Sequence, residues 1–286
     1  LEVGMGGRLD ATNAADAHVA LITNVGLEHA KELGSTIPQI AREKAGIIKK
    51  GAKAVTGCTQ PEAVKQIQSA CRKTRASLKI IGKDFDYSVR SASLGGTEFD
   101  YSGAGSYPRL RSSLLGRHQA SNASCAVAAM ECFQQLGFKI PEKAVREGLT
   151  NTKWPGRLEV MHRNPLVILD GAHNPGGINA LCAAIKELMP GKRPVIVTGI
   201  LADKDHLQMI SMLAPLASKM VFCKPNSERA ADPEILAAEA VKAGCSNADV
   251  LPDVSGAVRQ ALSSCLPSDA VVITGSLYTV GEARSF

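Results

Sequence analysis

The first residues that could do chemistry lie at the start of the chain. Glu2 stands just before a glycine-rich stretch, residues 4–8, with the sequence GMGGR. A carboxylate at the carboxyl end of a strand, followed by a flexible glycine loop, can hold Mg²⁺ beside a nucleotide. The stretch lacks the spacing of a G-x-G-x-x-G motif, so a simple glycine turn explains it equally well.

Two more polar residues follow the first predicted strand. His29 comes shortly after the apolar run 18–25, at a strand end where ligands collect, although a lone histidine is usually structural or exposed. Lys44 lies near the end of an amphipathic helix, where a lysine normally interacts with the helix dipole or with water. A buried lysine could instead lose its proton and attack CO₂ to form a carbamate. Composition and spacing do not decide between these roles.

Three residues of later segments are further candidates. Asn122 stands at the start of an alanine-rich helix, where polar side chains often act as caps. Arg157 follows the sequence WPG, and its planar guanidinium could bind phosphate oxygens or remain a surface cation. Asp170 opens the sequence DGAHNP at the end of an apolar strand, so it either faces a ligand at that edge or caps the next helix.

Apolar, β-prone runs alternate with helical patterns along the chain, which is typical of an α/β fold with a parallel sheet covered by helices. In the first part we predict strands at 18–25, 52–56 and 78–81, and helices at 37–48, 61–75, 119–136 and 141–149. Residues 82–116 carry alternating aromatic residues around Gly95 and Gly96, which predicts a hairpin or small antiparallel sheet.

A linker at 151–157 separates two predicted domains, 1–152 and 153–286. After the linker we predict strands at 167–169, 195–198, 220–223 and 270–274, and helices at 178–188, 206–217, 233–243 and 254–265. Strands and helices alternate throughout this part, so we expect a Rossmann-like domain.

Composition narrows the class of protein. A chain of 286 residues with 45% hydrophobic residues suits about two globular domains. The net charge of +6 suits acidic small substrates, and the scattered cations favour a solvated surface over a nucleic-acid-binding face. Eight cysteines without a C-x-x-C pair, no signal peptide and no run long enough to span a membrane predict a cytoplasmic protein with reduced core cysteines.

Three long segments resemble, in the same order, the folylpolyglutamate synthase and dihydrofolate synthase branch of the Mur ligase superfamily. They are residues 2–13, 22–29 and 42–48. Segments 201–205 and 274–278 are similar to the same branch, and the second would lie near the incoming glutamate or folate. The resemblance implies the C-terminal part of a P-loop-type central ATPase domain followed by a Rossmann-like C-terminal domain.

The resemblance also implies roles for the candidate residues. Glu2 and His29 would be Mg²⁺ ligands, and Lys44 would be a carbamylated lysine that helps to hold the metal–phosphate site. In the nucleotide site, the implied roles are adenine contact for Asn122, terminal-phosphate contact for Arg157, ribose and phosphate contact for Asp170, and a place beside the reacting carboxyl group for His173.

The activity that the resemblance implies is ATP-dependent attachment of L-glutamate to folate, to dihydropteroate or to both, through an acyl phosphate and with release of ADP. ATP and Mg²⁺ would be the cofactors, and the family expectation is a monomer without nucleic-acid or membrane partners. The P-loop pattern G-x-x-x-x-G-K-[ST] is absent from the sequence, which begins at Leu1 without a methionine. We therefore expect a fragment that is inactive alone. Another Mur-type amino-acid ligase, or a non-catalytic module that binds nucleotide or folate, remains as an alternative.

Overall fold

The computed structural model describes residues 1–27 and 29–285, which form two compact units. The first unit comprises Leu1–Ser91, Thr97–Ser113 and Arg117–Thr152. The second unit comprises Ala92–Gly96, Leu114–Gly116 and Lys153–Phe286. Each unit is described by itself.

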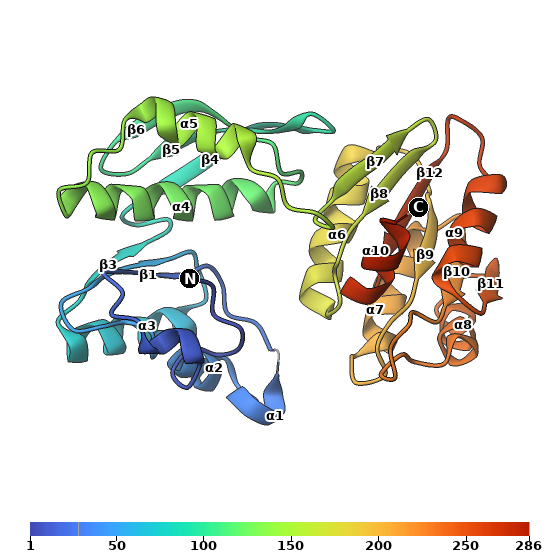
Figure 1. The fold of residues 1–286 in the computed structure, drawn as a ribbon, viewed down its shortest axis with the longest axis horizontal. Coiled ribbons are helices and arrows are strands. Elements are labelled where there is room, and N and C mark those ends of the chain that lie inside the picture. Colours follow the sequence, from blue (N-terminus) through green and yellow to red (C-terminus); the bar gives the residue numbers. More distant parts are fainter. Residues whose placement is uncertain (28, 286) are drawn as a thin grey trace. The chain divides into compact units, whose positions relative to one another are not determined.

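A parallel sheet of three strands lies inside the first unit, with helices on both of its faces (Figure 1). In spatial order the strands are β1 (Val19–Ile22), β2 (Lys53–Thr56) and β3 (Ser77–Ile80). Alternate side chains of a strand point to opposite faces. Ala20 and Ile22 accordingly pack against α2 (Ile37–Ala45) and α3 (Pro61–Thr74), whereas Val19 and Leu21 pack on the other face.

Helix α4 (His118–Gln135) covers that second face and is itself covered by a second sheet. The covering sheet is the antiparallel set β4 (Asp86–Ser93), β5 (Gly96–Ser102) and β6 (Ser106–Ser112), with α5 (Glu142–Asn151) beside β6. Because α4 lies between two sheets, it buries small residues on most of its circumference and shows no single apolar face. The prediction of an antiparallel sheet in this segment is confirmed, with three strands.

Helix α2 begins where the sequence predicted. The side chain of Thr36 accepts a hydrogen bond from the backbone N–H of Gln39, whose side-chain oxygen accepts one from the backbone N–H of Thr36. This reciprocal pair of hydrogen bonds is a capping box. Pro38 lies in the first turn, where a backbone N–H would have no acceptor within the helix, so the missing N–H of proline costs no hydrogen bond. The short elements η1 (Ala11–Ala14) and α1 (Ala30–Leu33) lie in the connections before it.

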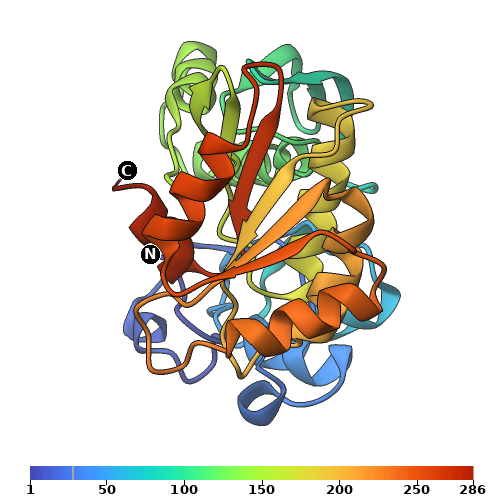
Figure 2. The same cartoon turned by 90° about the vertical axis from the view of Figure 1, so that its right-hand side faces the viewer.

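The second unit is built on a six-stranded sheet in the spatial order β11-β10-β9-β12-β8-β7 (Figure 2). The strands are β7 (Glu159–Arg163), β8 (Leu166–Leu169), β9 (Val195–Thr198), β10 (Lys219–Cys223), β11 (Ala248–Leu251) and β12 (Ala270–Thr274). All neighbours are parallel except β7, which runs antiparallel to β8.

Helices cover both faces of this sheet. One face, with Ile168, Ile196 and Phe222, packs against α6 (Pro175–Leu188), α7 (His206–Leu213) and α8 (Pro233–Lys242). The other face packs against α9 (Val254–Ser263) and α10 (Leu277–Ala283). This is the α/β arrangement expected from the alternation of strands and helices.

Three elements of the second unit were not predicted: β7, β11 and α10. The two strands lie at the edges of the sheet and are only partly buried, so their sequences carry polar residues at positions that central strands fill with apolar ones. Helix α10 is too short for a helical period to be recognised. The predicted helix 206–217 ends earlier and continues as the 3₁₀ turn η2 (Ala214–Leu216).

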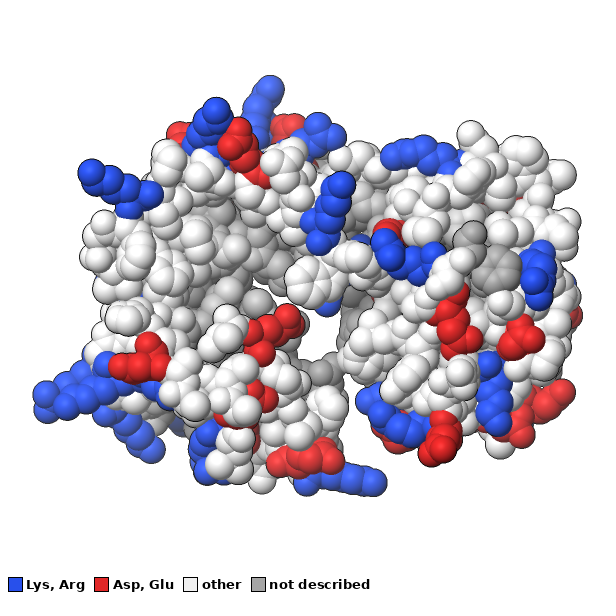
Figure 3. All heavy atoms as spheres, viewed as in Figure 1, with Lys and Arg blue, Asp and Glu red and all other residues white. Residues whose placement is uncertain are grey.

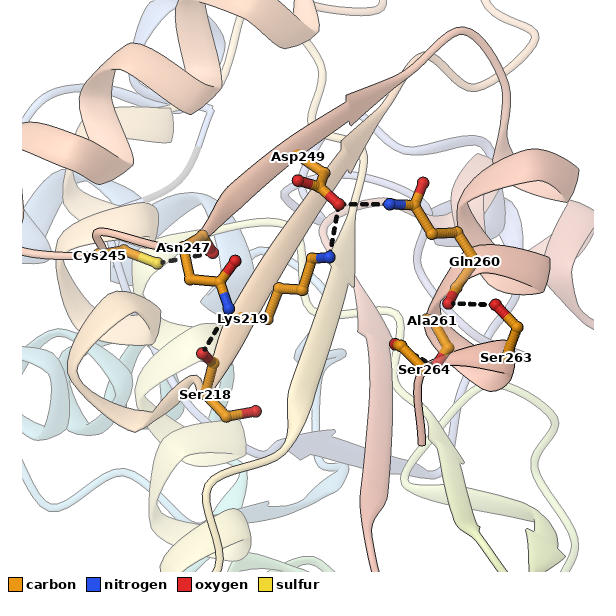
Figure 4. A network of polar contacts seen from close by, with 9 residues as sticks. All are labelled: Ser218, Lys219, Cys245, Asn247, Asp249, Gln260, Ala261, Ser263 and Ser264. Atoms are coloured by element: carbon orange, nitrogen blue, oxygen red, sulfur yellow. Dashed lines mark hydrogen bonds and ion pairs between the residues drawn. The ribbon is translucent and has the colours of Figure 1, made fainter. Parts of the chain in front are cut away.

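A polar network holds the edge strand β11 in place (Figure 4). Asp249 of β11 receives an ion pair from Lys219 of β10, with Nζ and Oδ2 2.5 Å apart. Gln260 of α9 donates a hydrogen bond to the same carboxylate oxygen. The carboxylate therefore joins the edge strand to its neighbouring strand and to helix α9.

The charged residues are distributed over the surface, and the cysteines are mostly buried, as the sequence predicted. On the face shown in Figure 3, both units carry Lys and Arg interspersed with Asp and Glu. All eight cysteines are free thiols, and seven are buried. Burial raises the pKa of the Cys125 and Cys223 thiols to about 12, so both remain protonated near neutral pH. No helix within residues 1–27 and 29–285 has the length and apolar character needed to cross a membrane.

Candidate functional site

A cavity of about 510 Å³ in the first unit brings together two of the predicted site residues. Glu2 and Lys44 both contribute to its wall, together with residues of β1 and of the 3₁₀ turn η1. Glu2 is exposed and Lys44 is half-buried. A carboxylate and an amine on one cavity wall can bind charged groups of a ligand, so the cavity is the candidate site of this unit.

The glycine loop lies against the end of helix α2, and this contact explains one glycine of the loop and one at the helix end. A side chain at Gly7 would lie 2.8 Å from Ile47 and 3.0 Å from the carbonyl oxygens of Glu43 and Lys44. A side chain at Gly46 would lie 2.5 Å from Arg8. The backbone of the loop therefore approaches the helix end that carries Lys44, and Arg8 N donates to Glu43 O at 2.9 Å.

Asp10 gives the glycine loop its shape. Its Oδ2 accepts hydrogen bonds from the N–H groups of Gly4 and Met5, each at 3.1 Å. Its Oδ1 accepts from the hydroxyl and the N–H of Thr12, at 2.6 and 3.0 Å. These bonds, the Thr12 hydroxyl first, lower the pKa of Asp10 to about 2. Sequence reasoning missed this residue, although Asp-x-Thr is a known turn pattern.

Asn13 and Lys49 also line the cavity and were not predicted. Asn13 Nδ2 donates to Arg8 O at 2.9 Å, and Lys49 Nζ donates to Asn13 O at 2.6 Å. The Asn13 Oδ1 atom is buried and has no hydrogen-bond partner within the described part of the chain. An unpaired amide oxygen in a residue that lines a cavity can accept a hydrogen bond from a ligand group.

The structure does not bring His29 to this cavity. His29 is exposed, has a positive φ of 51°, and its carbonyl accepts from the N–H groups of Glu32 and Leu33. Among residues 1–27 and 29–285, the cavity wall contains Glu2 and Lys44 but not His29. The neighbouring Glu28, part of the predicted motif, lies outside the described residues.

Asn122 lies in the first turns of α4 and bonds to other side chains. Its Nδ2 donates to Gln119 Oε1 at 3.1 Å, and Gln119 Nε2 lies 2.9 Å from His118 Nε2. The helix has Arg117 as its N-cap residue and no side-chain hydrogen bond at the cap. Asn122 therefore does not act as a cap, and it presents a half-buried amide within a row of polar groups.

In the second unit, Asp170 directly follows strand β8, and Arg157 lies in the loop before β7. Asp170 Oδ2 accepts from Leu158 N and Oδ1 accepts from Ala172 N, both at 3.0 Å. Burial raises the pKa of Asp170, against the effects of these two N–H groups and of the charges on Arg157 and His173. The side chain of Arg157 is exposed. The geometry thus places Arg157, Asp170 and His173 in one region.

The alternative role of Asp170, as the cap of the next helix, is not observed. Helix α6 is capped by Asn174, whose Oδ1 accepts from Gly177 N at 2.7 Å. His173, just before it, is half-buried, and its Nδ1 lies 2.8 Å from Gly171 O. The loop thus fixes the His173 ring through Nδ1.

The segment 274–278 lies beside these loops within the second unit. A side chain at Gly171 would come within 2.6 Å of Leu277, so the two loops are in contact. Ser276 is buried and caps α10 by accepting from Thr279 N at 3.1 Å. Tyr278 is exposed. Ser276 therefore has a structural role, whereas Tyr278 remains available to a ligand.

Both halves of the chain match known protein families. Residues 1–130 match the Mur ligase middle domain, and residues 156–277 match the Mur ligase glutamate ligase domain. A structure of Mycobacterium tuberculosis folylpolyglutamate synthase with ADP and AMPPCP has a TM-score of 0.90 and 34% identity, covering 99% of this chain and 67% of that one.

Two further solved structures are similar to the chain. Escherichia coli FolC in complex with DHPP and ADP has a TM-score of 0.87 and 31% identity, over 100% of this chain and 65% of that one. The bifunctional folylpolyglutamate synthase/dihydrofolate synthase of Yersinia pestis, complexed with AMPPNP and a Mn ion, has a TM-score of 0.86 and 30% identity, over 100% and 65%.

The chain spans between 34% and 66% of the length of curated relatives that it matches. Both matching domain families belong to Mur ligases, and the matching structures are folylpolyglutamate or dihydrofolate synthases. The chain therefore belongs to the folylpolyglutamate synthase/dihydrofolate synthase family of Mur ligases.

Proposed function

We propose that the chain is part of an ATP-dependent ligase that attaches L-glutamate to a folate, to dihydropteroate or to both. The observation that carries this proposal is the similarity to folylpolyglutamate synthase over 99% of the chain at a TM-score of 0.90. The relatives with bound ADP and DHPP support the choice of a nucleotide and a pterin-type acceptor as substrates.

The chemistry requires ATP because a carboxylate oxygen does not leave at neutral pH. The terminal phosphoryl group of ATP is transferred to a carboxylate oxygen of the acceptor, which gives an acyl phosphate and ADP. The amine of glutamate attacks the acyl carbon, a tetrahedral intermediate forms, and its C–O bond to phosphate breaks to leave the amide. Proteins contribute to such transfers mainly by positioning the reactants and stabilising charge.

In this mechanism Arg157 binds oxygens of the phosphoryl group, since its exposed guanidinium can donate two parallel hydrogen bonds. His173 lies beside the reacting carboxyl group, and Asn122 contacts the adenine through its amide. Asp170 would contact the ribose or phosphates. These roles come from the family resemblance, and the domain division at 152 and 153 is proposed on the same basis.

The residues of the first unit fit a magnesium ion bound together with a nucleotide. Mg²⁺ is usually held by one or two carboxylates, with phosphates and water completing its shell. Glu2 offers such a carboxylate at the cavity wall, and no cluster of three or more metal-binding side chains occurs in the described ranges. Mg²⁺ at Glu2 would neutralise phosphate charge, with Lys44, as a carbamate, beside it. The family resemblance also gives His29 as a ligand, but His29 is not among the described residues that line this cavity.

The proposal is tested by ADP release from the complete gene product, because no P-loop pattern occurs within these 286 residues. We expect ADP release that requires glutamate and either dihydropteroate or a tetrahydrofolate, and that falls at least tenfold in Arg157→Ala. Arg163→Ala, which removes another exposed arginine of the second unit, is the matched control and should retain activity.

Two results would contradict the proposal. ADP release with a different amino acid but not with glutamate would indicate another Mur-type ligase. Nucleotide binding without any acceptor-dependent turnover would indicate a binding module built on the same fold.

A further inference from the structure

The loop that carries Arg157 is fixed to the body of the second unit on both sides of that residue. On one side, Gly156 N donates to Glu159 Oε2 at 2.7 Å, and Gly156 O accepts from Gly171 N at 2.7 Å. On the other side, Leu158 N donates to Asp170 Oδ2 at 3.0 Å. Asn151 ends α5 and Thr152 Oγ1 donates to Gly148 O, so the predicted linker 151–157 is shorter at both ends, and Arg157 belongs to the second unit.

The backbone at Leu158 needs this support. Leu158 has a φ of 45°, in the left-handed region that residues with a branched side chain rarely adopt. Two contacts hold it there: its side chain is buried in the core of the unit, and its N–H bonds to Asp170. Removing the second contact frees the residue that follows Arg157.

Asp170 connects this loop to the loop that carries His173. Its second oxygen accepts from Ala172 N, so the two oxygens of one side chain hold two separate loops. The Asp170 backbone is itself held within the sheet, because its N–H donates to Ile273 O of β12 at 2.9 Å. A rigid strand end thus fixes both loops through a single carboxylate.

We propose that Asp170 is a positioning residue that holds the Arg157 loop and the His173 loop in register, in addition to any contact that it makes with the nucleotide. This inference rests on the proposed function for the roles of Arg157 and His173. Burial raises the pKa of Asp170, and the charges of Arg157 and His173 oppose this rise, which agrees with their closeness to the carboxylate.

The distinguishing change is Asp170→Asn. An asparagine of the same shape has one acceptor oxygen where aspartate has two, so one of the N–H groups of Leu158 and Ala172 faces the amide NH₂ instead. The orientation of Arg157 is then lost without removal of any apolar contact. Asp253→Ala is the matched control, because Asp253 caps α9 in the same unit through Gly256 N and contacts neither loop.

Hydrogen exchange tests the inference without any need for ligase activity. We expect the amides of residues 156–158 to exchange at least tenfold faster in Asp170→Asn, and to be unchanged in Asp253→Ala. Unchanged exchange in Asp170→Asn would overturn the inference even if the complete protein proved to be a ligase.

A double-mutant cycle on the complete protein supplies the second test. If Asp170 acts through Arg157, then Asp170→Asn lowers kcat at least tenfold in the wild type but less than twofold in an Arg157→Ala background, with the KM for ATP little changed. An equal loss in both backgrounds, with a raised KM for ATP, would show that Asp170 acts only by direct contact with the nucleotide and would overturn the inference.

Discussion

The hydroxyl of Thr279 allows a quantitative test of the packing at the carboxyl edge of the second sheet. Thr279 is fully buried; its Oγ1 donates to Gly199 O at 2.8 Å and lies 2.8 Å from Ser276 Oγ. Thr279→Val keeps the shape of the side chain and removes both contacts. Each buried polar group left without a partner costs about 1–3 kcal/mol. Gly199 O loses this donor, whereas Ser276 Oγ still accepts from the backbone N–H of Thr279, so we expect the free energy of unfolding to fall by about 1–3 kcal/mol.

Thr198 provides the matched control for this prediction. Its Oγ1 is also fully buried, but it has no hydrogen-bond partner within residues 1–27 and 29–285. Thr198→Val therefore removes no hydrogen bond, and we expect a change within about 0.5 kcal/mol or a gain in stability. Urea unfolding followed by circular dichroism measures both variants. If Thr198→Val lost as much stability as Thr279→Val, the hydrogen bonds assigned here would not be the source of the stability.

Two further predictions concern the first unit. Lys79→Met should lower the free energy of unfolding by about 3–5 kcal/mol, because it leaves the buried Glu131 carboxylate without its ion pair at 2.5 Å. The double variant Lys79→Met/Glu131→Gln should recover part of this loss, because the Gln side chain still accepts from Gly105 N. Urea unfolding measures both variants, and a double variant less stable than Lys79→Met would contradict this prediction. Asp10, with its pKa lowered from 3.8 to about 2, should stabilise the native state above pH 3.8 and lose that effect as the pH falls towards 2. The urea midpoint should therefore fall more steeply over this range in the wild type than in Asp10→Asn, and equal slopes would show that the Asp10 bonds do not contribute.

The bounds of a strand were predictable where both of its faces are buried, because such a strand consists almost entirely of apolar residues. Strands β9 and β12 have the predicted bounds because they lie in the middle of the second sheet, with neighbours on both sides and helices on both faces. Strands β7 and β11 have one neighbour each and mix polar with apolar residues. Their existence depends on pairing with a distant strand, and no local pattern records that pairing.

The candidate site was predictable to the extent that residue type and position at a strand end indicate chemistry. Glu2 and Lys44 were selected separately and lie on one cavity wall, and Asp170 was selected together with Arg157. The sequence could not show that Gly7 packs on the end of α2, because that contact depends on the path of the chain between them. For His29, the position in the motif predicted a metal ligand, but it could not predict that this residue would not line the cavity.

Two aspartates show how far the role of a carboxylate in a loop depends on the fold. Asp10 and Asp170 each use Oδ1 for the N–H two residues later, a local turn that the sequence can predict. Each uses Oδ2 for an N–H of another part of a loop, Gly4 for Asp10 and Leu158 for Asp170, at a separation that only the fold determines. Glycine loops contain many backbone N–H groups without regular partners, and each of them needs an acceptor. A carboxylate beside such a loop is therefore evidence for a ligand only after the N–H groups of the loop have been assigned their partners.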